Sequence, residues 1–574
     1  MEYFQSVLKE AQETCYKKTP EIKSKERKAF VEACELFQEA VQAKQAVENQ
    51  KDLEKLEKNQ QKAMKKCVKA ASKIFKDLDI SAAEGLEGAI LKGYCIIQAT
   101  PEGLAKFVEE DEKIHTKLIK TLLKTPSLIK EMLIHGGPKH GMFGQAMKIY
   151  TQILAQFPEE EDKFTPINKK IALAVALELC FPMTEFDTKI VVDPVKRYKH
   201  YEKAHRNGEL DPAFPHFSVW ELRHVINCDA KNDQLQWIRD CLMNYAPYIA
   251  AITDIKQRYL YILDTDVLQR DPSWTDSPRT YQQVLSGGGR DAPNAWFGRF
   301  ILKAFGLPTW GCKQPGRNSL TRWTPTGWEA MLGANWDTCS WEGVSGVDFK
   351  AEVDARCGHS TDEYYKKLIL IEGLAEVQDS RRADIPEEEK TMLHPLRLWR
   401  SLSIIQKALM LEPASPEKFE RSGPGLVKTR VETYIEEFEL DKPEGEIGLN
   451  DKGILKIPAS AHGFTSGNLM VISSYGGGRQ LNFLADGKVE YELPVGIEEK
   501  TYILSLDVCT VHLKQAPLLL QVDEGEPITI KVPYTVGEWI TTHACRVNVS
   551  EGSILRFSRE RPCFGLAIKN ISLH

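Results

Sequence analysis

The sequence contains no long hydrophobic run. Nowhere in its 574 residues do about 18 consecutive apolar residues occur, the length that a helix needs to cross a bilayer. The N-terminal segment MEYFQSVLKEAQETCYKK also lacks the apolar stretch of a secretory signal peptide. We therefore expect a cytoplasmic protein that has no membrane partner.

Closely spaced cysteines and a surplus of one charge are missing as well. The 13 cysteines are scattered without CxxC spacing, which argues against structural zinc and for reduced thiols. The sequence has 75 basic and 81 acidic side chains, so its net charge is negative and does not favour binding to nucleic acid. The glycine run 287–289 lacks the lysine and Ser/Thr of a P-loop. We expect no metal, no cofactor and no nucleic-acid partner.

Glycine and proline are absent from residues 21–79, where charged residues alternate with apolar ones at helical spacing. This pattern predicts one long helix or a helical hairpin over residues 1–80. Its apolar stripe either binds a coiled-coil partner or packs on the next domain, and we favour packing on the next domain. Helical periodicity continues through residues 81–275, with a capping box at Ser218 and Glu221.

Residues 284–343 are unusually rich in tryptophan. A glycine turn at 287–289 precedes Pro293, and Gly306 ends an apolar run with helical spacing. Two short β-type runs follow, at 320–324 and 328–332. The order is therefore a loop, a buried helix and antiparallel strands. An aromatic-walled groove is expected here, formed by Trp296, Trp310, Gln314, Trp323, Trp328 and Trp336.

The run AWFGRFILKAFGLPT, followed by QPG and RWTPTGWEAMLGANW, resembles the transglutaminase-like (papain-like) superfamily. It is most similar to planctomycete and marine-bacterial members. The resemblance spans roughly residues 171–341 and implies a catalytic cysteine before the helix and a histidine on the first strand. Those positions hold Asp291 and Arg317 here. The resemblance thus implies a degenerate catalytic site.

Asp291 and Arg317, which stand at the two catalytic positions, cannot perform the family's chemistry. A carboxylate is a poor nucleophile toward amides, and a guanidinium does not release its proton near neutral pH. One interpretation is that Asp291 and Arg317 form a salt bridge in a cleft that has lost its catalytic activity, and the other is that both are solvated loop charges. Cys312 is the spare nucleophile if catalysis has been relocated.

Short β-type runs separated by turn residues fill the chain beyond residue 437. They predict an antiparallel β-sandwich of jelly-roll type. The segments PYTVGEW, EGSILRFSRERP and FGLAIKNISL resemble the last strands of carbohydrate-binding-module-like sandwiches. Trp539, with Tyr475, Tyr491 and Tyr534, could stack on a sugar or plug the sandwich core.

The predicted fold class is multidomain α+β, with a helical N-terminal half, a transglutaminase-like α+β core and a C-terminal β-sandwich. The predicted parts are a helical segment 1–80, a helical domain 81–275, a core with closing helices 276–414, a linker 415–436 and the sandwich 437–574. Three functions remain: a non-catalytic protein that binds protein or polysaccharide, a cysteine-dependent acyltransferase or amide hydrolase, and a structural subunit. The sequence does not determine the oligomeric state.

Overall fold

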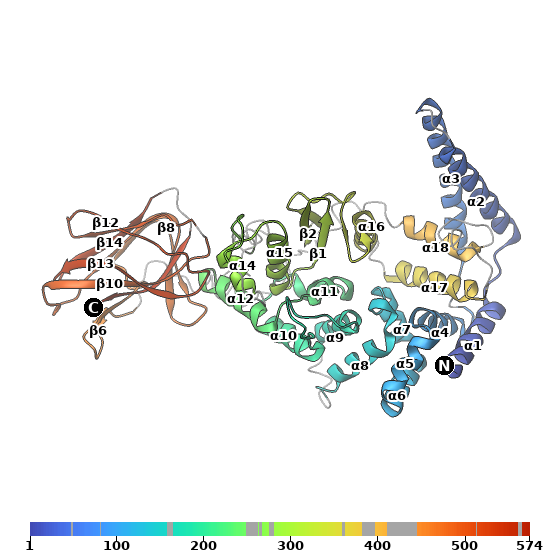
Figure 1. The fold of residues 1–574 in the computed structure, drawn as a ribbon, viewed down its shortest axis with the longest axis horizontal. Helices are drawn as coiled ribbons and strands as arrows, with labels where there is room; N and C mark the ends of the chain where they lie inside the picture. The colour runs from blue at the N-terminus through green and yellow to red at the C-terminus, as the bar shows by residue number, and fades with distance from the viewer. Residues whose placement is uncertain are drawn as a thin grey trace.

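The computed structural model describes residues 1–46, 50–80, 82–157, 165–247, 249, 262, 267–274, 280–325, 327–358, 362–381, 397–409, 445–512, 514–560 and 565–574. Figure 1 shows an elongated molecule with helices at one end, a small sheet in the middle and a β-sandwich at the other end. This is the multidomain α+β architecture expected from the sequence. The predicted linker 415–436 lies outside the described residues.

The N-terminal helices are α1 (Glu2–Lys18), α2 (Ser24–Gln45) and α3 (Gln50–Asp77). Of the two predicted arrangements, a long helix or a helical hairpin, α2 and α3 form a hairpin, which projects from the body in Figure 1. Phe30 and Cys34 of α2 are buried in the same core as Cys67 and Ala71 of α3. The apolar stripes of α2 and α3 therefore pack largely on each other.

A continuous helical body follows. Its α-helices are α4 (Leu86–Ala99), α5 (Pro101–Glu110), α6 (Glu112–Lys124), α7 (Pro126–Ile134), α8 (Phe143–Leu154), α9 (Pro166–Leu179), α10 (Pro194–Arg206), α11 (Val219–Ile226) and α12 (Asn232–Tyr245), with 3₁₀ turns η1 (Lys139–Gly141) and η3 (Phe214–His216). Helix α9 is the centre of this body, because every residue from Ile171 to Leu179 is buried. The predicted capping box of α11 is confirmed, with Ser218 and Glu221 exchanging hydrogen bonds.

The middle of the molecule joins α14 (Tyr281–Gly287) and α15 (Ala292–Ala304) to a five-stranded antiparallel sheet of order β3-β2-β1-β4-β5. Its strands are β1 (Thr309–Gln314), β2 (Arg317–Thr324), β3 (Gly327–Met331), β4 (Ser340–Trp341) and β5 (Val344–Ser345), followed by α16 (Gly346–Gly358). Helix α15 packs on β1 and β2. The predicted order of loop, buried helix and antiparallel strands is confirmed.

Helices α17 (Asp362–Asp379) and α18 (Leu398–Leu409) lie with the N-terminal helices rather than with the small sheet. Helix α17 packs on α4, α1 and α7, and α18 packs on α17 and α3. The apolar residues that were expected to close the middle domain therefore join the core of the N-terminal helices.

The C-terminal sandwich has strands β6 (Gly448–Leu449), β7 (Leu455–Pro458), β8 (Phe464–Ser473), β9 (Arg479–Glu492), β10 (Lys500–Cys509), β11 (Leu518–Val522), β12 (Ile528–Ile530), β13 (Ile540–Val549), β14 (Ile554–Arg559) and β15 (Leu566–Leu573), all antiparallel where paired. The sequence has two separate β-type runs, 481–484 and 489–493, which suggest two strands, but both belong to the single strand β9. Gly487 lies between the two runs and passes close to the backbone of Gly467 in β8, so the strand pair continues through it.

One side of the sandwich is docked on α12. Asn482 Nδ2 donates to Tyr245 O over 2.7 Å, and Asn244 Nδ2 donates to Gly537 O over 3.2 Å. Cys509 and Ala567 of the sandwich belong to the same buried core as the helices. The sandwich is therefore packed against the helical body as well as covalently joined to it. Every described helix is too short or too polar to cross a lipid bilayer.

Candidate functional site

Asp291 and Arg317, the two positions singled out by the resemblance, lie on different elements and do not pair with each other. Asp291 is the N-cap residue of α15, exposed, with φ of 55°, a conformation that non-glycine residues rarely adopt. Arg317 begins β2 at the tip of the β1–β2 hairpin, and its Nη1 donates to Leu332 O over 3.4 Å. Among the ion pairs of the described residues, none joins these two. Of the two interpretations, the salt bridge is wrong, because Arg317 lies at the tip of the β1–β2 hairpin and bonds to Leu332 O instead.

Cys312, the spare nucleophile candidate, is fully buried in β1. Burial and a hydrogen bond with Cys339 both hold the pKa of its thiol far above the ordinary value. A protonated, inaccessible thiol cannot attack a substrate.

The predicted aromatic residues divide into different environments. Trp296 and Trp310 line one cavity. Trp323 and Trp328 are buried in the core, and Trp336 packs against it. The side-chain amide of Gln314 is engaged within the protein: its nitrogen donates to Gly333 O, and its oxygen accepts from Asn335 N and Thr338 Oγ1.

The aromatic residues of the sandwich are largely engaged within the protein. Tyr491 is buried and donates to Ala459 O over 2.8 Å. Tyr475 donates to Asp240 of α12 over 3.1 Å. Trp539 packs against the core of the helical body, with Lys569 Nζ 5.7 Å from its ring centroid. The docking of the sandwich on α12 thus employs residues that the sequence offers for sugar stacking.

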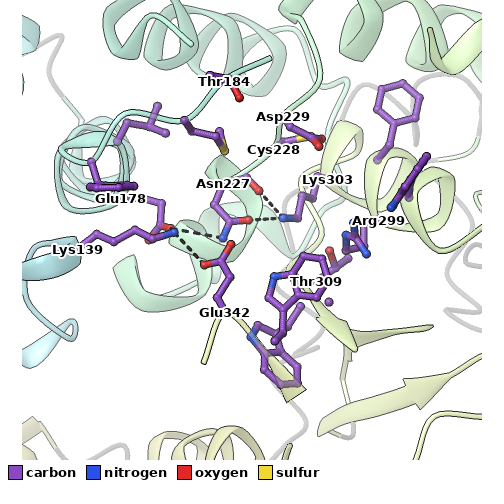
Figure 2. A pocket seen from close by; sticks show the side chains of 18 of the residues that line it. Lys139, Glu178, Thr184, Asn227, Cys228, Asp229, Arg299, Lys303, Thr309 and Glu342 are labelled. Atoms are coloured by element: carbon purple, nitrogen blue, oxygen red, sulfur yellow. Dashed lines mark hydrogen bonds and ion pairs between the residues drawn. The ribbon is translucent and has the colours of Figure 1, made fainter. Parts of the chain in front are cut away.

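The cavity beside α15 has a volume of about 370 Å³ and is drawn in Figure 2. It lies where η1, the end of α9, the loop after α11, α15, β1 and the β4–β5 turn converge. Its polar side chains and its aromatic walls come from Lys139, Glu178, Thr184, Asn227, Cys228, Asp229, Tyr281, Trp296, Arg299, Phe300, Lys303, Thr309, Trp310, Trp341 and Glu342.

One side of the cavity is an ion-pair network. Lys139 Nζ lies 3.2 Å from Glu178 Oε1 and 2.9 Å from Glu342 Oε2, as Figure 2 shows. Arg223 Nε lies 3.0 Å from the other oxygen of Glu178. Burial alone would raise the pKa of Glu178, but Arg223 and Lys139 lower it to about 2. Glu178 is therefore ionised and neutralised by its partners at physiological pH.

The opposite side is basic and formed by α15. Arg299 and Lys303 are four residues apart, so they project from one face of the helix. Lys303 Nζ donates to Asn227 O over 2.5 Å and also to Asn227 Oδ1, both neutral acceptors. Burial, with a contribution from Arg299, lowers the pKa of Lys303 to about 8.

The remaining wall is the loop after α11. Asp229 accepts a hydrogen bond of 2.8 Å from the Tyr281 hydroxyl, and its backbone carbonyl accepts from Phe186 N. Burial, followed by the charge of Asp229, raises the pKa of the Cys228 thiol. Burial and Asp229 likewise raise the pKa of Tyr281 well above its usual range. Both groups therefore stay protonated near neutral pH.

Most of this site was not predicted from the sequence. The residues that were not predicted include Arg299, Lys303, Thr309 and Trp341. The available signal is the pair of basic residues spaced four apart within the otherwise apolar helix WFGRFILKAF. Among the side chains that the structure describes, no cluster of three metal-binding groups occurs.

Comparison with known proteins yields neither a matching family model nor a matching curated protein. Among the similar solved structures are an exo-β-1,3-galactanase from Phanerochaete chrysosporium (15% identity, TM-score 0.19, 21% of this chain and 29% of that one) and a family 35 carbohydrate binding module from Clostridium thermocellum (14%, TM-score 0.19, 21% and 96%). A third is the C-terminal CBM6 of LamC from Zobellia galactanivorans (18%, TM-score 0.18, 21% and 98%).

These matches fall on the C-terminal sandwich. The chain spans less than a third of the galactanase that it matches. At these TM-scores the likeness carries no argument about function, and none of the matches supports the transglutaminase-like resemblance of the middle region.

Proposed function

We propose that the protein is a non-catalytic binding protein whose ligand is a carbohydrate unit held in the cavity beside α15. The supporting observation is that three tryptophans, Trp296, Trp310 and Trp341, line one cavity together with fixed donors and acceptors. Sugar rings present apolar faces that suit aromatic walls, and their hydroxyls both donate and accept hydrogen bonds. The volume of about 370 Å³ lies within the range typical of small-ligand sites.

The same cavity is poorly suited to acyl transfer by a cysteine. Cys228 is the thiol that lines it, and burial holds the pKa of that thiol above its usual value. Cys312 is buried in the sheet and also protonated. Without a thiolate the family's reaction cannot begin. We therefore propose a binding relative of the transglutaminase-like enzymes rather than an active member.

The sandwich has a structural role in this proposal. Its hydrogen bonds to α12 and its shared core with the helices fit a scaffold function.

The described cysteines are free thiols, which fits a reducing compartment.

A glycan array probed with the full chain tests the proposal, with Trp341→Ala as the site variant. Loss of an aromatic wall should weaken binding about tenfold. Trp336→Ala is the matched control, because Trp336 packs on the core outside the cavity lining. If the wild-type protein binds no glycan, or if Trp341→Ala binds as well as the wild type, the proposal is wrong.

A further inference from the structure

The basic side of the cavity contains a guanidinium with one nitrogen that has no hydrogen-bond partner among the described residues. Arg299 Nη1 is buried and has no hydrogen-bond partner among the described residues. Its guanidinium carbon lies 4.6 Å from the centroid of the Trp341 ring, which holds the group by a cation–π contact. Figure 2 shows Arg299 across the cavity from Lys139. A buried donor without an acceptor is costly, so such a group in a cavity wall indicates a ligand acceptor.

A second unpartnered group lines the same cavity. Thr309, the first residue of β1, is fully buried, and its hydroxyl has no hydrogen-bond partner in the described structure. Thr309 comes from a different element than Arg299, and both line the cavity. Two independent elements therefore each contribute to the cavity lining a residue that has a buried polar atom without a hydrogen-bond partner among the described residues.

The charges around the cavity leave this side positive. Glu178 and Glu342 are neutralised by Lys139 and Arg223 on the other side. The basic side has Arg299 and Lys303 against the single carboxylate of Asp229, which accepts from Tyr281. Two cations against one carboxylate leave an excess of one positive charge. A ligand anion would supply the missing acceptor and the missing charge together.

We propose that Arg299, Thr309 and Lys303 bind the anionic group of an acidic sugar, either a carboxylate or a sulfate ester. This inference rests on the proposed function, because it names the ligand class of the same cavity. Charge-assisted hydrogen bonds from a guanidinium are among the stronger polar contacts, so the acidic group dominates selection among sugars.

The test compares oligogalacturonates with their carboxyl-reduced counterparts, which share the backbone and lack the charge. Sulfated oligosaccharides form a third arm that separates the two sources of negative charge. Titration calorimetry of the full chain should show at least about tenfold tighter binding of one acidic series than of the neutral series.

Arg299→Gln should weaken binding of the acidic series about 10- to 100-fold and leave the carboxyl-reduced series little changed. Arg290→Gln is the matched control, because Arg290 is exposed and pairs with Asp271 outside the cavity. If the acidic and neutral series bind equally well and Trp341→Ala loses sugar binding, this inference is wrong and the proposed function still holds. Binding of no sugar at all overturns both.

Thr309→Val provides a readout that does not depend on the tolerance of Arg299 to substitution. The change removes a buried hydroxyl without a partner, so the free protein should melt at a higher temperature. Binding of the acidic series should fall about threefold to tenfold at the same time. A structural role for the hydroxyl predicts the opposite, with a lower melting temperature, and would contradict the assignment.

Discussion

His224 is a buried imidazole enclosed by aromatic rings. Its ring centroid lies 4.5 Å from that of Trp220, 5.5 Å from that of Trp328 and 5.3 Å from that of Phe349. Burial lowers its pKa to about 3. The unfolded chain takes up a proton near pH 6.5, so this group favours folding above that pH and its contribution is lost as the pH falls toward 3.

At pH 5 the loss at His224 amounts to about 2 kcal/mol. We expect His224→Phe to remove this pH dependence while keeping an aromatic ring in place. The fall in melting temperature between pH 7.5 and pH 5 should be smaller by about 2 °C in the variant. His216→Phe is the control, because His216 is exposed. Identical falls in His224→Phe and wild type would contradict burial of the neutral imidazole.

We expect Lys303 to set the pH dependence of binding of the proposed acidic ligand. Its pKa is lowered to about 8, and the charged or titratable groups around it are Cys228, Arg299, Asp229 and Glu178. The protonated amine binds an anion and the neutral amine does not, so affinity for the acidic ligand should fall about tenfold between pH 7 and pH 9. In Lys303→Met, binding should be weaker at pH 7 and nearly independent of pH. Titrations at several pH values measure both, and an unchanged slope in Lys303→Met would show that another group titrates.

At the scale of elements, β1 and β4 must approach closely to form the aromatic wall. A Cβ at Gly311 in β1 would lie 2.3 Å from the Trp341 ring, well inside van der Waals contact. We expect Gly311→Ala to displace Trp341 and to weaken sugar binding about tenfold, as loss of the ring itself does.

Gly448→Ala is the control for this substitution, because a Cβ there meets no atom within 4 Å. Tryptophan fluorescence and glycan titration report the displacement and its effect. Wild-type affinity in Gly311→Ala would show that the Trp341 ring does not hold the ligand.

At the scale of the whole molecule, the sandwich depends on close contact with α12. Gly537 has φ of 83°, and a Cβ there would lie 2.6 Å from Cys241 O of α12. Gly537→Ala should therefore loosen the docking and speed amide hydrogen exchange in α12. Gly552→Ala is the matched control, because Gly552 has φ of 75° but no atom within 4 Å of the added Cβ. Equal exchange in the two variants would show that backbone strain, rather than contact with α12, is responsible.

Much of the architecture could be predicted locally. The apolar spacing of α15, its early Pro293 and the terminal Gly306 act within one stretch of chain, as does the capping box of α11. The separation of the apolar runs 481–484 and 489–493 into two strands was wrong, because Gly487 between them serves a close strand approach that depends on Gly467 in the partner strand.

The sequence by itself determined the succession of helices, small antiparallel sheet and sandwich, because periodicity and turn residues act over a few neighbours. Only the tertiary structure decided that Arg317 lies at a hairpin tip, that Trp323 and Trp328 serve the core, and that α17 packs on α4. The cavity also forms only in the tertiary structure, because its walls come from separate segments between Lys139 and Glu342. The groups that surround a buried charge come from segments far apart in the chain, and a local sequence pattern does not indicate which groups those are.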